Sequence, residues 1–473
     1  MTTLTTSTDT TSTDTTSTDT TWTDWATLRD NVSGRLVTRE DPEYADARLG
    51  WIVNVDQRPA AILEVAHVGD VVEAVGFARD RGLAVSAQPG GHAARTTVDD
   101  TLLLRTRALG GIEIDRARGT ATVGAGVKWG ELCAALDGTG LMALVGSNPD
   151  VTVVGLALGG GVSWFTRAHG FTANSVVAFD VVTACGELEH VTRASDPDLF
   201  WALRGGGGDF AIVVRVELAL FPAPEMHGGQ LFWPVEHAPA VLRAFRDLAL
   251  VAPRELTLWA HVMHFPPMPE LPEPIRGQSF VTVAATYLGS KQLFDALLWS
   301  LRDAAPVVMD SMRPIQPSEV GDVAQEPVDP MPSMEHSMLL TGFDDAAIDA
   351  LLAVVGTPGA TPLMMTQVRG LGGAFADDNP AGGAVRPVSE PFQLMSVGVP
   401  AVPELAAVIP HAFAALDAAL GGVASGYRMP NFAGAAQSDA GGYDADRLAR
   451  LRALKIDRDP DGVIRSNKPV LGR

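Results

Sequence analysis

The sequence Pro89-Gly90-Gly91-His92 follows a short apolar stretch, residues 83–86, and places two glycines directly before a histidine. Glycine allows positive φ angles and the close approach of another group, and adjacent backbone N–H groups in such a loop can bind an anion. The histidine could serve as a base, a metal ligand, a covalent anchor or a buried bystander. This segment alone leaves all four roles open.

Two more glycine clusters follow in the same part of the chain, LGGGVSW at residues 158–164 and GGGGDF at residues 205–210. Any one of them is commonly a tight turn. A long ligand with a pyrophosphate, however, needs close backbone approach at several places. The three clusters therefore indicate either a set of turns or an extended cofactor site.

Motifs of other chemistries are missing or incomplete. No G-x-x-x-x-G-K-[ST] phosphate loop is present, and GAGVKWG at residues 124–130 has the wrong last spacing for a dinucleotide fingerprint. Ser163 lacks the second glycine of a nucleophile elbow. His261 and His264 lack a glutamate partner for a metal ion, so no metal site is predicted.

The elements that must position the glycine clusters alternate between strand and helix from about Pro59. A strand at residues 60–66 leads into a helix at residues 69–82, for which we expect Asp70 to be the cap and Gly82 the stop. Period-2 patterns predict a strand at 101–106, hairpins at 112–126 and 175–195, and a buried strand at 210–221. Short helices are expected at 129–140 and from Pro197.

The pattern changes after residues 222–225, where amphipathic helices and strands are interleaved. Helices are predicted at 238–252 and 344–356, and strands at 279–289 and 362–373. The tail shows a helix near residues 443–455, a turn at Asp461-Gly462 and an extended end. These patterns predict a second α+β domain followed by a C-terminal segment.

Composition narrows the function classes. The 473 residues carry a net charge of −21, which argues against nucleic acid and anionic membranes as partners. The N-terminal Thr/Ser/Asp repeat should be disordered and has no secretory signal pattern. No apolar run long enough for a membrane span is recognised, and Cys133 and Cys185 are not expected to pair. We expect a cytoplasmic protein of unassigned oligomeric state.

Taken in order, these segments resemble the berberine-bridge-enzyme-like FAD-linked oxidases of the vanillyl-alcohol-oxidase superfamily, which have a PCMH-type FAD-binding domain. The similarity runs from about residue 25 to the C-terminus. Besides PGGH, it rests on VVGLALGGGVSWFTRAHGF (153–171), DPDLFWALRGGGGDF (196–210), DRLARLRALK (446–455) and the terminal Asn467-Lys468-Pro469-Val470. The order and spacing of the pieces carry the resemblance, because no single piece is specific.

The resemblance implies FAD as the cofactor, bonded through the 8α-methyl group of the flavin to His92. The alternative is a hydrogen-bonded loop histidine with non-covalent FAD. Asn148 stands where many relatives have a second, cysteine link, so attachment through His92 alone is expected. Val151 stands at the position that gates oxygen near flavin C4a, where valine goes with oxidase behaviour. The cofactor-binding set implied in this way is Gln88, Pro89, Gly90, Gly91, His92, Ala93, Asn148, Val151, Gly155, Leu158, Gly159, Gly160, Gly161, Ser163, Asn174, Val213 and Asn431.

The catalytic residues are less well defined by the resemblance. Relatives commonly have Tyr-x-Asn-Phe before the last helix, and this chain has Met429 in the tyrosine place. Tyr427 would share the face of Met429 on a strand, so Tyr427 and Asn431 are the catalytic candidates. Tyr427 could equally be a packed strand residue. Gly370 replaces a histidine and Asn174 an aspartate that are common in relatives.

The resemblance implies an α+β fold of two lobes. The expected units are a disordered tail (1–24), a PCMH-type FAD-binding domain (25–222), a substrate domain with a sheet over the flavin (223–424) and a segment that returns to the FAD-binding domain (425–473). The expected reaction is a two-electron oxidation of a small organic molecule, with hydride transfer to flavin N5 and reoxidation by O2 to H2O2. Methionines of the second domain suggest an apolar or aromatic substrate, and a sugar-like one stays open. The alternatives are a dehydrogenase with another acceptor, a cyclase or lyase without net redox change, and a non-catalytic binder.

Overall fold

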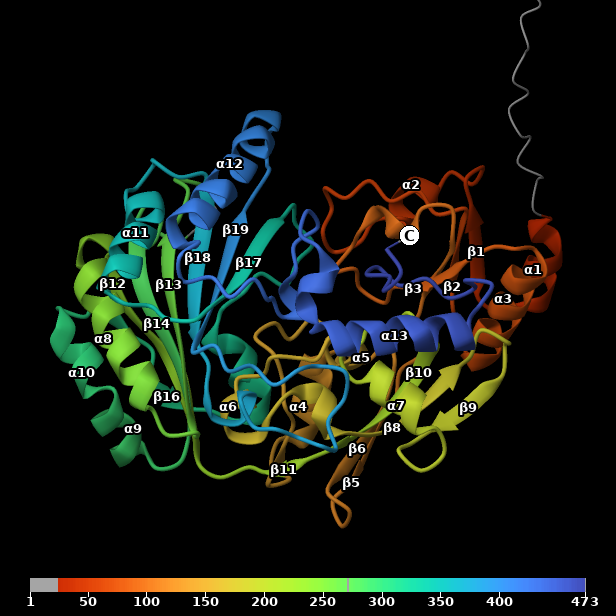
Figure 1. The fold of residues 1–473 in the computed structure, drawn as a ribbon, viewed down its shortest axis with the longest axis horizontal. Coiled ribbons are helices and arrows are strands. Elements are labelled where there is room, and N and C mark those ends of the chain that lie inside the picture. Colours follow the sequence, from red (N-terminus) through yellow and green to blue (C-terminus); the bar gives the residue numbers. More distant parts are fainter. Residues whose placement is uncertain (1–23, 270–271, 473) are drawn as a thin grey trace, which may run out of the picture.

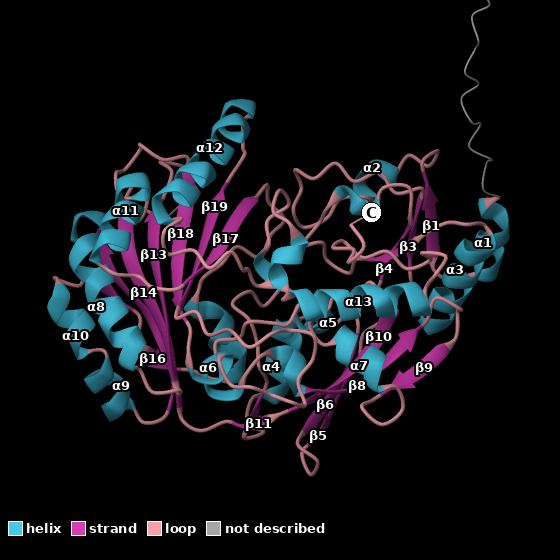
Figure 2. Ribbon diagram, viewed as in Figure 1, coloured by secondary structure: helices cyan, strands magenta, loops and turns pink. Residues whose placement is uncertain are grey.

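The computed structural model describes residues 24–269 and 272–472, which form two lobes lying side by side (Figure 1). The predicted disordered tail falls outside the described residues except for Asp24. Helices and strands are interspersed along the described chain (Figure 2). The predicted α+β fold is therefore confirmed.

The first lobe contains two main sheets. In the smaller one, parallel pairs join β2, β4 and β3, and β1 adds to β2 antiparallel. The larger sheet is antiparallel, and both predicted hairpins form in it. In spatial order the strands are β1 (Arg35–Thr38), β2 (Ala61–Glu64), β4 (Leu102–Arg105) and β3 (Val85–Ala87), then β5 (Ile112–Asp115), β6 (Thr120–Gly124), β10 (Ile212–Ala219), β8 (Val176–Val182) and β9 (Leu188–Val191). A two-stranded pair, β11 (Phe221–Pro222) with β7 (Leu141–Met142), lies apart from both.

Helices of the first lobe pack around these sheets. They are α1 (Trp25–Asn31), α2 (Tyr44–Ala47), α3 (Val68–Asp80), α4 (Trp129–Leu136), α5 (Val153–Leu158), α6 (Thr166–His169), α7 (Pro197–Leu203) and α13 (Ala445–Arg458). Helix α13 comes from the C-terminal end of the chain, yet its Leu451 lies in the core of the first lobe. The following segment also returns there, because the backbone N–H of Val85 donates to the carbonyl of Val463 (2.6 Å).

The predicted helix cap at Asp70 is wrong. The N-cap residue of α3 is His67, and Asp70 lies three residues further on, where its carboxylate accepts from the backbone N–H of Ala66 (2.8 Å) and of Ser33 (2.8 Å). Gly82 follows the helix with a φ of 66°, as expected. The carboxylate therefore joins the helix start to two other segments instead of capping the helix alone.

The second lobe is built on one large antiparallel sheet. Its strands in spatial order are β15 (Met309–Asp310), β12 (Met226–Pro234), β14 (Ser279–Leu288), β13 (Leu256–His264), β18 (Leu363–Gly370), β19 (Phe392–Gly398) and β17 (Met334–Leu340), with β16 (Arg313–Pro314) also on β12. The covering helices are α8 (Ala238–Val251), α9 (Lys291–Leu297), α10 (Trp299–Ala304), α11 (Asp345–Val355) and α12 (Pro403–Leu420). The helices and strands predicted for this part of the sequence are confirmed.

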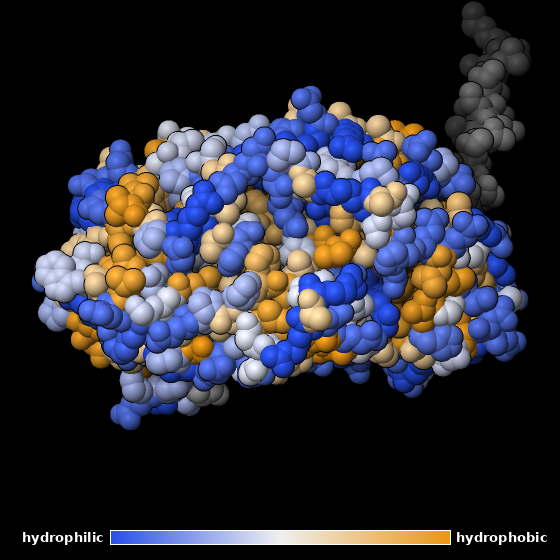
Figure 3. Space-filling model, turned by 90° about the horizontal axis from the view of Figure 1, so that it is seen from below, coloured by the Kyte–Doolittle hydropathy of each residue, from blue (hydrophilic) through white to orange (hydrophobic). Residues whose placement is uncertain are grey.

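The sequence analysis recognised no apolar run long enough to span a membrane, but helix α12 meets that criterion. Among the described residues it alone is long and apolar enough to be a candidate span by composition, with a mean hydropathy of 1.2. It contains Pro410, and Ile409, Phe413 and Leu416 on one side are buried in the core of the second lobe. The helix thus covers one face of the sheet (Figure 1). Seen from below, the surface mixes hydrophilic and hydrophobic side chains (Figure 3).

The two faces of the large sheet differ in chemistry. Side chains alternate along a strand, and Leu258, Ala260 and Val368 belong to the helix-covered core. The opposite face carries Trp259 and His261 on β13, paired with Arg369 and Gln367 on β18. Trp259, Ala284 and Leu339 of this second face are part of the core of the first lobe. We call it the polar face, and it is the side of the sheet that meets the first lobe.

Candidate active site

The PGGH segment forms a tight corner after β3. Gly91 has a φ of 84°, and a Cβ atom added there would lie 2.7 Å from the Cα atom of Gly50. The backbone N–H of Trp51 donates to the carbonyl of Gly90 (2.9 Å) and that of Ile52 to the carbonyl of Gly91 (3.3 Å). Glycine is therefore required at position 91 both by conformation and by the close approach of residues 50–52.

His92 projects from this corner onto another ring. The imidazole stacks on Trp51, with ring centroids 4.5 Å apart, and its Nε2 atom lies 3.2 Å from Oδ2 of Asp150. Burial lowers the pKa of His92, and the hydrogen bond and charge of Asp150 oppose that shift. Nδ1 makes no hydrogen bond within the described part of the chain. A largely uncharged ring with a spare nitrogen is suited to a covalent link.

The second glycine cluster is held by Asn431. Nδ2 of this side chain donates to the carbonyl of Leu156 (3.2 Å), and Oδ1 accepts from the backbone N–H of Gly161 (2.8 Å). Gly160 and Gly161 have φ angles of 101° and 76°. Both ends of the amide are thus engaged by the backbone around the glycines. Asn431, expected to be catalytic, is placed here as a residue that positions this loop.

The loop that contains Asn148 and Val151 connects the two lobes. Nδ2 of Asn148 donates to the carbonyl of Pro327 (2.8 Å), and its Oδ1 accepts from the backbone N–H of Asp150 (2.8 Å). Asp150 in turn binds Lys128 as well as His92. Val151 is half-buried beside them. The structure therefore brings His92, Asn148 and Val151 together through Asp150.

The remaining predicted cofactor residues have diverse surroundings. Oδ1 of Asn174 accepts from the backbone N–H of Gly383 (3.0 Å), and Oγ of Ser163 accepts from that of Phe165 (3.0 Å). Val213 lies in β10 within the core. The carbonyl of Ala93 accepts from Nδ2 of Asn467 (2.8 Å). Asn174 also lines a cavity of about 240 Å³ with His169 and Arg386, between α6 and the segment before β19.

One buried polar atom beside the PGGH corner fits a bound cofactor. Oε1 of Gln88 accepts from Arg105 (2.6 Å), but its Nε2 atom is buried without a partner in the described chain. A buried amide donor without a partner is costly unless something else accepts its hydrogen bond. Together with the free Nδ1 of His92, this donor suits a long ligand with oxygen acceptors, such as FAD.

Tyr427 does not occupy the strand that the sequence predicted. Residues 427–429 are irregular, so the shared strand face with Met429 is wrong. The tyrosine ring is 37% exposed, and the guanidinium of Arg386 lies 4.1 Å from its centroid. Met429 is buried in the core of the first lobe. A glycine-rich connection and the short helical turn at Pro430–Phe432 replace the expected strand.

The polar face brings together buried side chains that the sequence analysis did not connect with the site. Nε2 of His261 lies 2.5 Å from Nε2 of Gln367, and Nδ1 lies 3.1 Å from Oγ1 of Thr282. Nε of Arg369 donates to Oε1 of Gln367, and its guanidinium carbon lies 3.9 Å and 4.4 Å from the ring centroids of Trp259 and Phe432. Burial, then the charge of Arg369, lowers the pKa of His261 to about 3. The only sequence signal for these side chains was the alternation of residue types with period 2 around Arg369, which predicts a strand.

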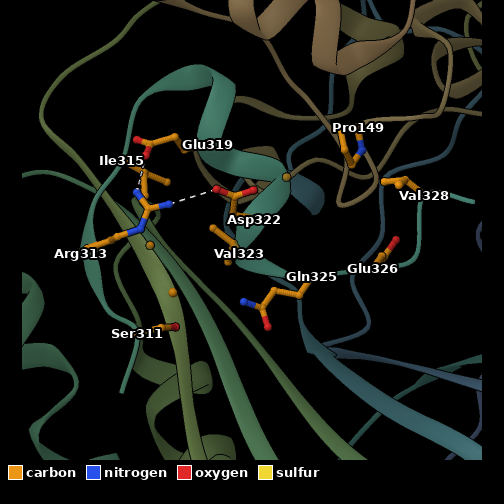
Figure 4. A pocket seen from close by; sticks show the side chains of 13 residues that line it. Pro149, Ser311, Arg313, Ile315, Glu319, Asp322, Val323, Gln325, Glu326 and Val328 are labelled. Atoms are coloured by element: carbon orange, nitrogen blue, oxygen red, sulfur yellow. Dashed lines mark hydrogen bonds and ion pairs between the residues drawn. The ribbon is translucent and has the colours of Figure 1, made fainter. Parts of the chain in front are cut away.

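Two carboxyl groups accompany Arg369. Burial raises the pKa of Glu326 and of Glu335, and positive neighbours oppose both shifts. Burial lowers the pKa of Arg369 to about 10, with the two glutamates opposing, so it stays charged at neutral pH. Glu326 also lines a cavity of about 280 Å³ together with Pro149, Gly228 and Arg313 (Figure 4). No group of three metal-ligating side chains occurs among residues 24–269 and 272–472.

His261 and His264 differ in their positions. They are three residues apart on β13, so they point to opposite faces of the sheet. His264 binds Ser279 (2.8 Å) and the carbonyl of Val355 (2.8 Å). His261 and His264 therefore cannot bind the same metal ion.

Comparison with known proteins agrees with this geometry. Residues 59–192 match a family of FAD binding domains. The chain is 31% identical over 287 residues to (R)-6-hydroxynicotine oxidase of Paenarthrobacter nicotinovorans, covering 60% of this chain and 61% of that one. It is 32% identical over 250 residues to glucooligosaccharide oxidase of Sarocladium strictum, covering 50% of each chain. The matched part thus spans about half to three-fifths of these curated relatives.

Solved structures share the fold across both lobes. The wild-type BBE-like 1 protein of Physcomitrella patens has a TM-score of 0.82 at 19% identity, covering 94% of this chain and 98% of that one. The 6-hydroxy-D-nicotine oxidase of Arthrobacter nicotinovorans has a TM-score of 0.77 at 24% identity, covering 91% and 96%. The matched family shows that residues 59–192 form an FAD binding domain. The fold of both lobes is similar to that of the BBE-like protein, in agreement with the resemblance that the sequence motifs carry.

Proposed function

We propose that the chain is an FAD-dependent oxidase that removes two electrons from a small organic molecule and transfers them to O2, giving H2O2. The observation that carries this proposal is the position of His92. Its ring stacks on Trp51 (4.5 Å), and Nε1 of Trp51 donates to the carbonyl of Val328 (3.1 Å), in the segment that leads to the polar face. A flavin held at His92 would therefore lie near the second lobe.

The flavin attachment is proposed to run through His92 alone. Asn148, in the place of a second link, has an amide that is already hydrogen-bonded at both ends. Cys133 is buried in α4, where burial raises its pKa to about 12, and Cys185 lies in the β8–β9 turn. Neither cysteine lies in the loop of Asn148 itself. When bound, the flavin would accept a hydride from a substrate C–H at N5 and deliver the electrons to O2.

The substrate is proposed to be a small molecule with apolar and hydrogen-bonding parts. A cross-strand row on the polar face, Met263, Met365, Val397 and Glu335, is only partly buried. It combines apolar side chains with one carboxyl group. The names of the relatives suggest two donors for a first screen, 6-hydroxynicotine and short glucose oligosaccharides.

The test begins with the purified holoprotein. Flavin that stays with the acid-precipitated polypeptide, on the peptide that carries His92, supports the attachment. Release of all flavin by acid, or an adduct on a cysteine peptide, contradicts it. The matched control is His92→Ala, which should bind flavin only non-covalently.

Peroxide formation with the donor panel then separates the candidate functions. Flavin bleaching without oxygen, followed by peroxide on aeration, supports an oxidase. Bleaching with slow reoxidation indicates a dehydrogenase with another acceptor. Substrate conversion without oxygen uptake indicates a cyclase or lyase. This alternative is considered because Met429 and Gly370 replace the tyrosine and histidine that are common in relatives. Spectral perturbation with no conversion indicates a non-catalytic binder.

A further inference from the structure

The proposed oxidation needs a group that accepts a proton, and the position expected for it is not suitable. Tyr427 is exposed under Arg386, and Met429 has no titratable group. On the polar face, both ring nitrogens of His261 have partners, and its pKa of about 3 leaves it a weak base. The proton acceptor must therefore come from another element.

One segment runs between the polar face and the loop of Asn148, where a proton acceptor is needed. Residues 324–333, here called the crossing segment, lead from the side of β12 to β17, which lie on opposite sides of the sheet. At its start the carbonyl of Val323 accepts from Nε2 of Gln230 on β12 (2.7 Å). Further on, Pro327 binds Asn148 and Val328 binds Trp51 of the first lobe. The segment thus passes beside the polar face and touches the loop of His92.

Glu326 lies in the middle of the crossing segment. Figure 4 shows its side chain near Pro149 and Val328, on the side of the cavity away from Arg313. Glu326 is half-buried, and the carbonyl of the next residue, Pro327, accepts a hydrogen bond from Asn148 (2.8 Å). It is therefore next to the loop that carries Asn148 and Val151.

The charged groups facing Glu326 come from two strands. Arg369 on β18 is the positive one, and Glu335 on β17 is the negative one. Nε of Arg369 donates to Oε1 of Gln367. Burial raises the pKa of Glu326, and the charge of Arg369 opposes that shift.

The other carboxyl groups are placed less suitably. Glu335 faces Lys468 and Arg95 on the first lobe and does not line the cavity. Glu319 and Asp322 line it but are paired with Arg313, at 2.7 Å and 3.1 Å. Glu326 alone among the described carboxyl groups lines the cavity, faces Arg369 and touches the loop of Asn148.

We propose that Glu326 is the proton acceptor of the oxidation and that the cavity of about 280 Å³ carries the proton to solvent. This inference rests on the proposed oxidase function. As a C–H bond of the substrate loses hydride to the flavin, the adjacent O–H or N–H bond breaks and its proton goes to the Glu326 carboxylate. The substrate becomes a carbonyl or imine. The carboxylic acid then releases the proton through the cavity, and O2 takes two electrons and two protons to form H2O2.

The decisive variant is Glu326→Gln, which keeps the side-chain shape but cannot accept the proton. Loss of a general base lowers kcat by about 10²- to 10⁴-fold, with little change in KM. The matched control is Glu319→Gln, in the same cavity but paired with Arg313. It should retain wild-type kcat with whichever donor, 6-hydroxynicotine or cellobiose, gives peroxide.

A second measurement needs no substrate. Infrared difference spectra of the holoprotein between acid and neutral pH should contain C=O bands of carboxyl groups that titrate above the usual glutamate range, because burial raises the pKa of both Glu326 and Glu335. Glu326→Gln should remove one of these bands, and Glu319→Gln should remove none. If Glu326→Gln does not fold, Glu326→Asp should move the midpoint of one of these bands.

The outcomes separate this inference from the proposed function. Wild-type kcat in Glu326→Gln, or a spectrum from which this variant removes no titrating band, would overturn the role of Glu326 and leave an active oxidase. A wild-type protein without bound flavin, or without peroxide from any donor, would instead contradict the proposed function. A pH profile of kcat whose acid limb persists unchanged in Glu326→Gln would also overturn the inference.

Discussion

At the scale of single residues, the two catalytic candidates of the sequence, Asn431 and Tyr427, have different surroundings: Asn431 is bonded to the backbone of the glycine loop, and Tyr427 is exposed. Asn431→Ala removes the acceptor for the N–H of Gly161 and the donor to Leu156. Leaving such buried groups unpaired costs about 1–3 kcal/mol, so denaturant unfolding should show lower stability and a lower flavin-to-protein ratio. Tyr427→Phe, at an exposed site, should change neither. Loss of flavin reduction in Tyr427→Phe with an unaffected Asn431→Ala would restore Tyr427 as the catalytic candidate.

A substitution at Val151 tests whether this residue controls the reaction of the reduced flavin with oxygen. It is half-buried in the loop between Asp150 and α5, and leucine is one methylene longer. Val151→Leu should cost roughly 1–3 kcal/mol if the site is tightly packed and slow flavin reoxidation at least tenfold by our proposal, while anaerobic reduction changes little. Stopped-flow measurement of the two half-reactions separates these effects.

The control for that experiment is Val154→Leu, a neighbouring buried valine in the core of the first lobe. It should disturb packing without changing the oxygen reaction. Equal reoxidation rates in wild type and Val151→Leu would remove the gate at Val151. Slow reoxidation in the wild type would favour a dehydrogenase.

At the scale of elements, Asp70 joins three segments and makes stability depend on pH. Burial would raise the pKa of Asp70, but backbone N–H groups from Ser33, Ala66 and His67 outweigh it, so the pKa lies below the ordinary value of 3.8. The contribution is therefore complete above the unfolded-state pKa and is lost as pH falls through the lower folded-state pKa.

Asp70→Asn should accordingly lower the free energy of unfolding at pH 7 by about 1.5–3 kcal/mol, the range for hydrogen bonds to a charged group. The difference from wild type should shrink as pH falls below 4. Urea unfolding at both pH values measures it. Asp80→Asn, an exposed carboxylate at the end of the same helix, is the control and should have little effect at either pH. A difference for Asp70→Asn that does not change with pH would contradict the linkage.

Sequence patterns predicted most elements because their signals are local. Helices α3, α8, α11 and α13 and both hairpins follow from apolar periodicity and turn residues within single segments. The glycine spacing likewise located the corner at His92. The strand at Tyr427 failed because Asn431 and Gly434 fix an irregular path there through distant partners.

The polar face could not be predicted in the same way. His261 on β13 and Gln367 on β18 are separated by a long stretch of sequence and become neighbours only through strand pairing. Their local patterns resemble ordinary buried strands, and the sequence does not state which strands pair. Glu326 lies in a segment without regular structure. Such a segment has no residue periodicity from which the direction of a side chain could be predicted. Candidate residues on loops thus carry local motifs in the sequence, whereas the side chains that the sheet brings together carry none.

At the scale of the whole molecule, the polar face packs against the first lobe, so the stability of each lobe depends on this contact. Trp259 of the large sheet stacks on Trp164 of the first lobe, with ring centroids 3.5 Å apart and both side chains fully buried. Oγ1 of Thr286 also donates to the carbonyl of Trp164 (3.3 Å). The flavin is proposed to lie between the same surfaces, so its retention should depend on their contact.

We therefore expect the wild-type protein to unfold in one thermal transition, with the flavin becoming exposed to solvent at the same temperature. Trp259→Ala removes a buried ring from the contact and should cost about 3–5 kcal/mol, so flavin fluorescence should rise before the bulk of the secondary structure is lost. Trp299→Ala, at a site 65% exposed on α10, is the matched control and should leave both events together at nearly the wild-type temperature. Calorimetry and flavin fluorescence on the same samples measure the two events. A rise of flavin fluorescence well before unfolding in the wild type, or equal effects of the two tryptophan variants, would show that the lobes unfold independently.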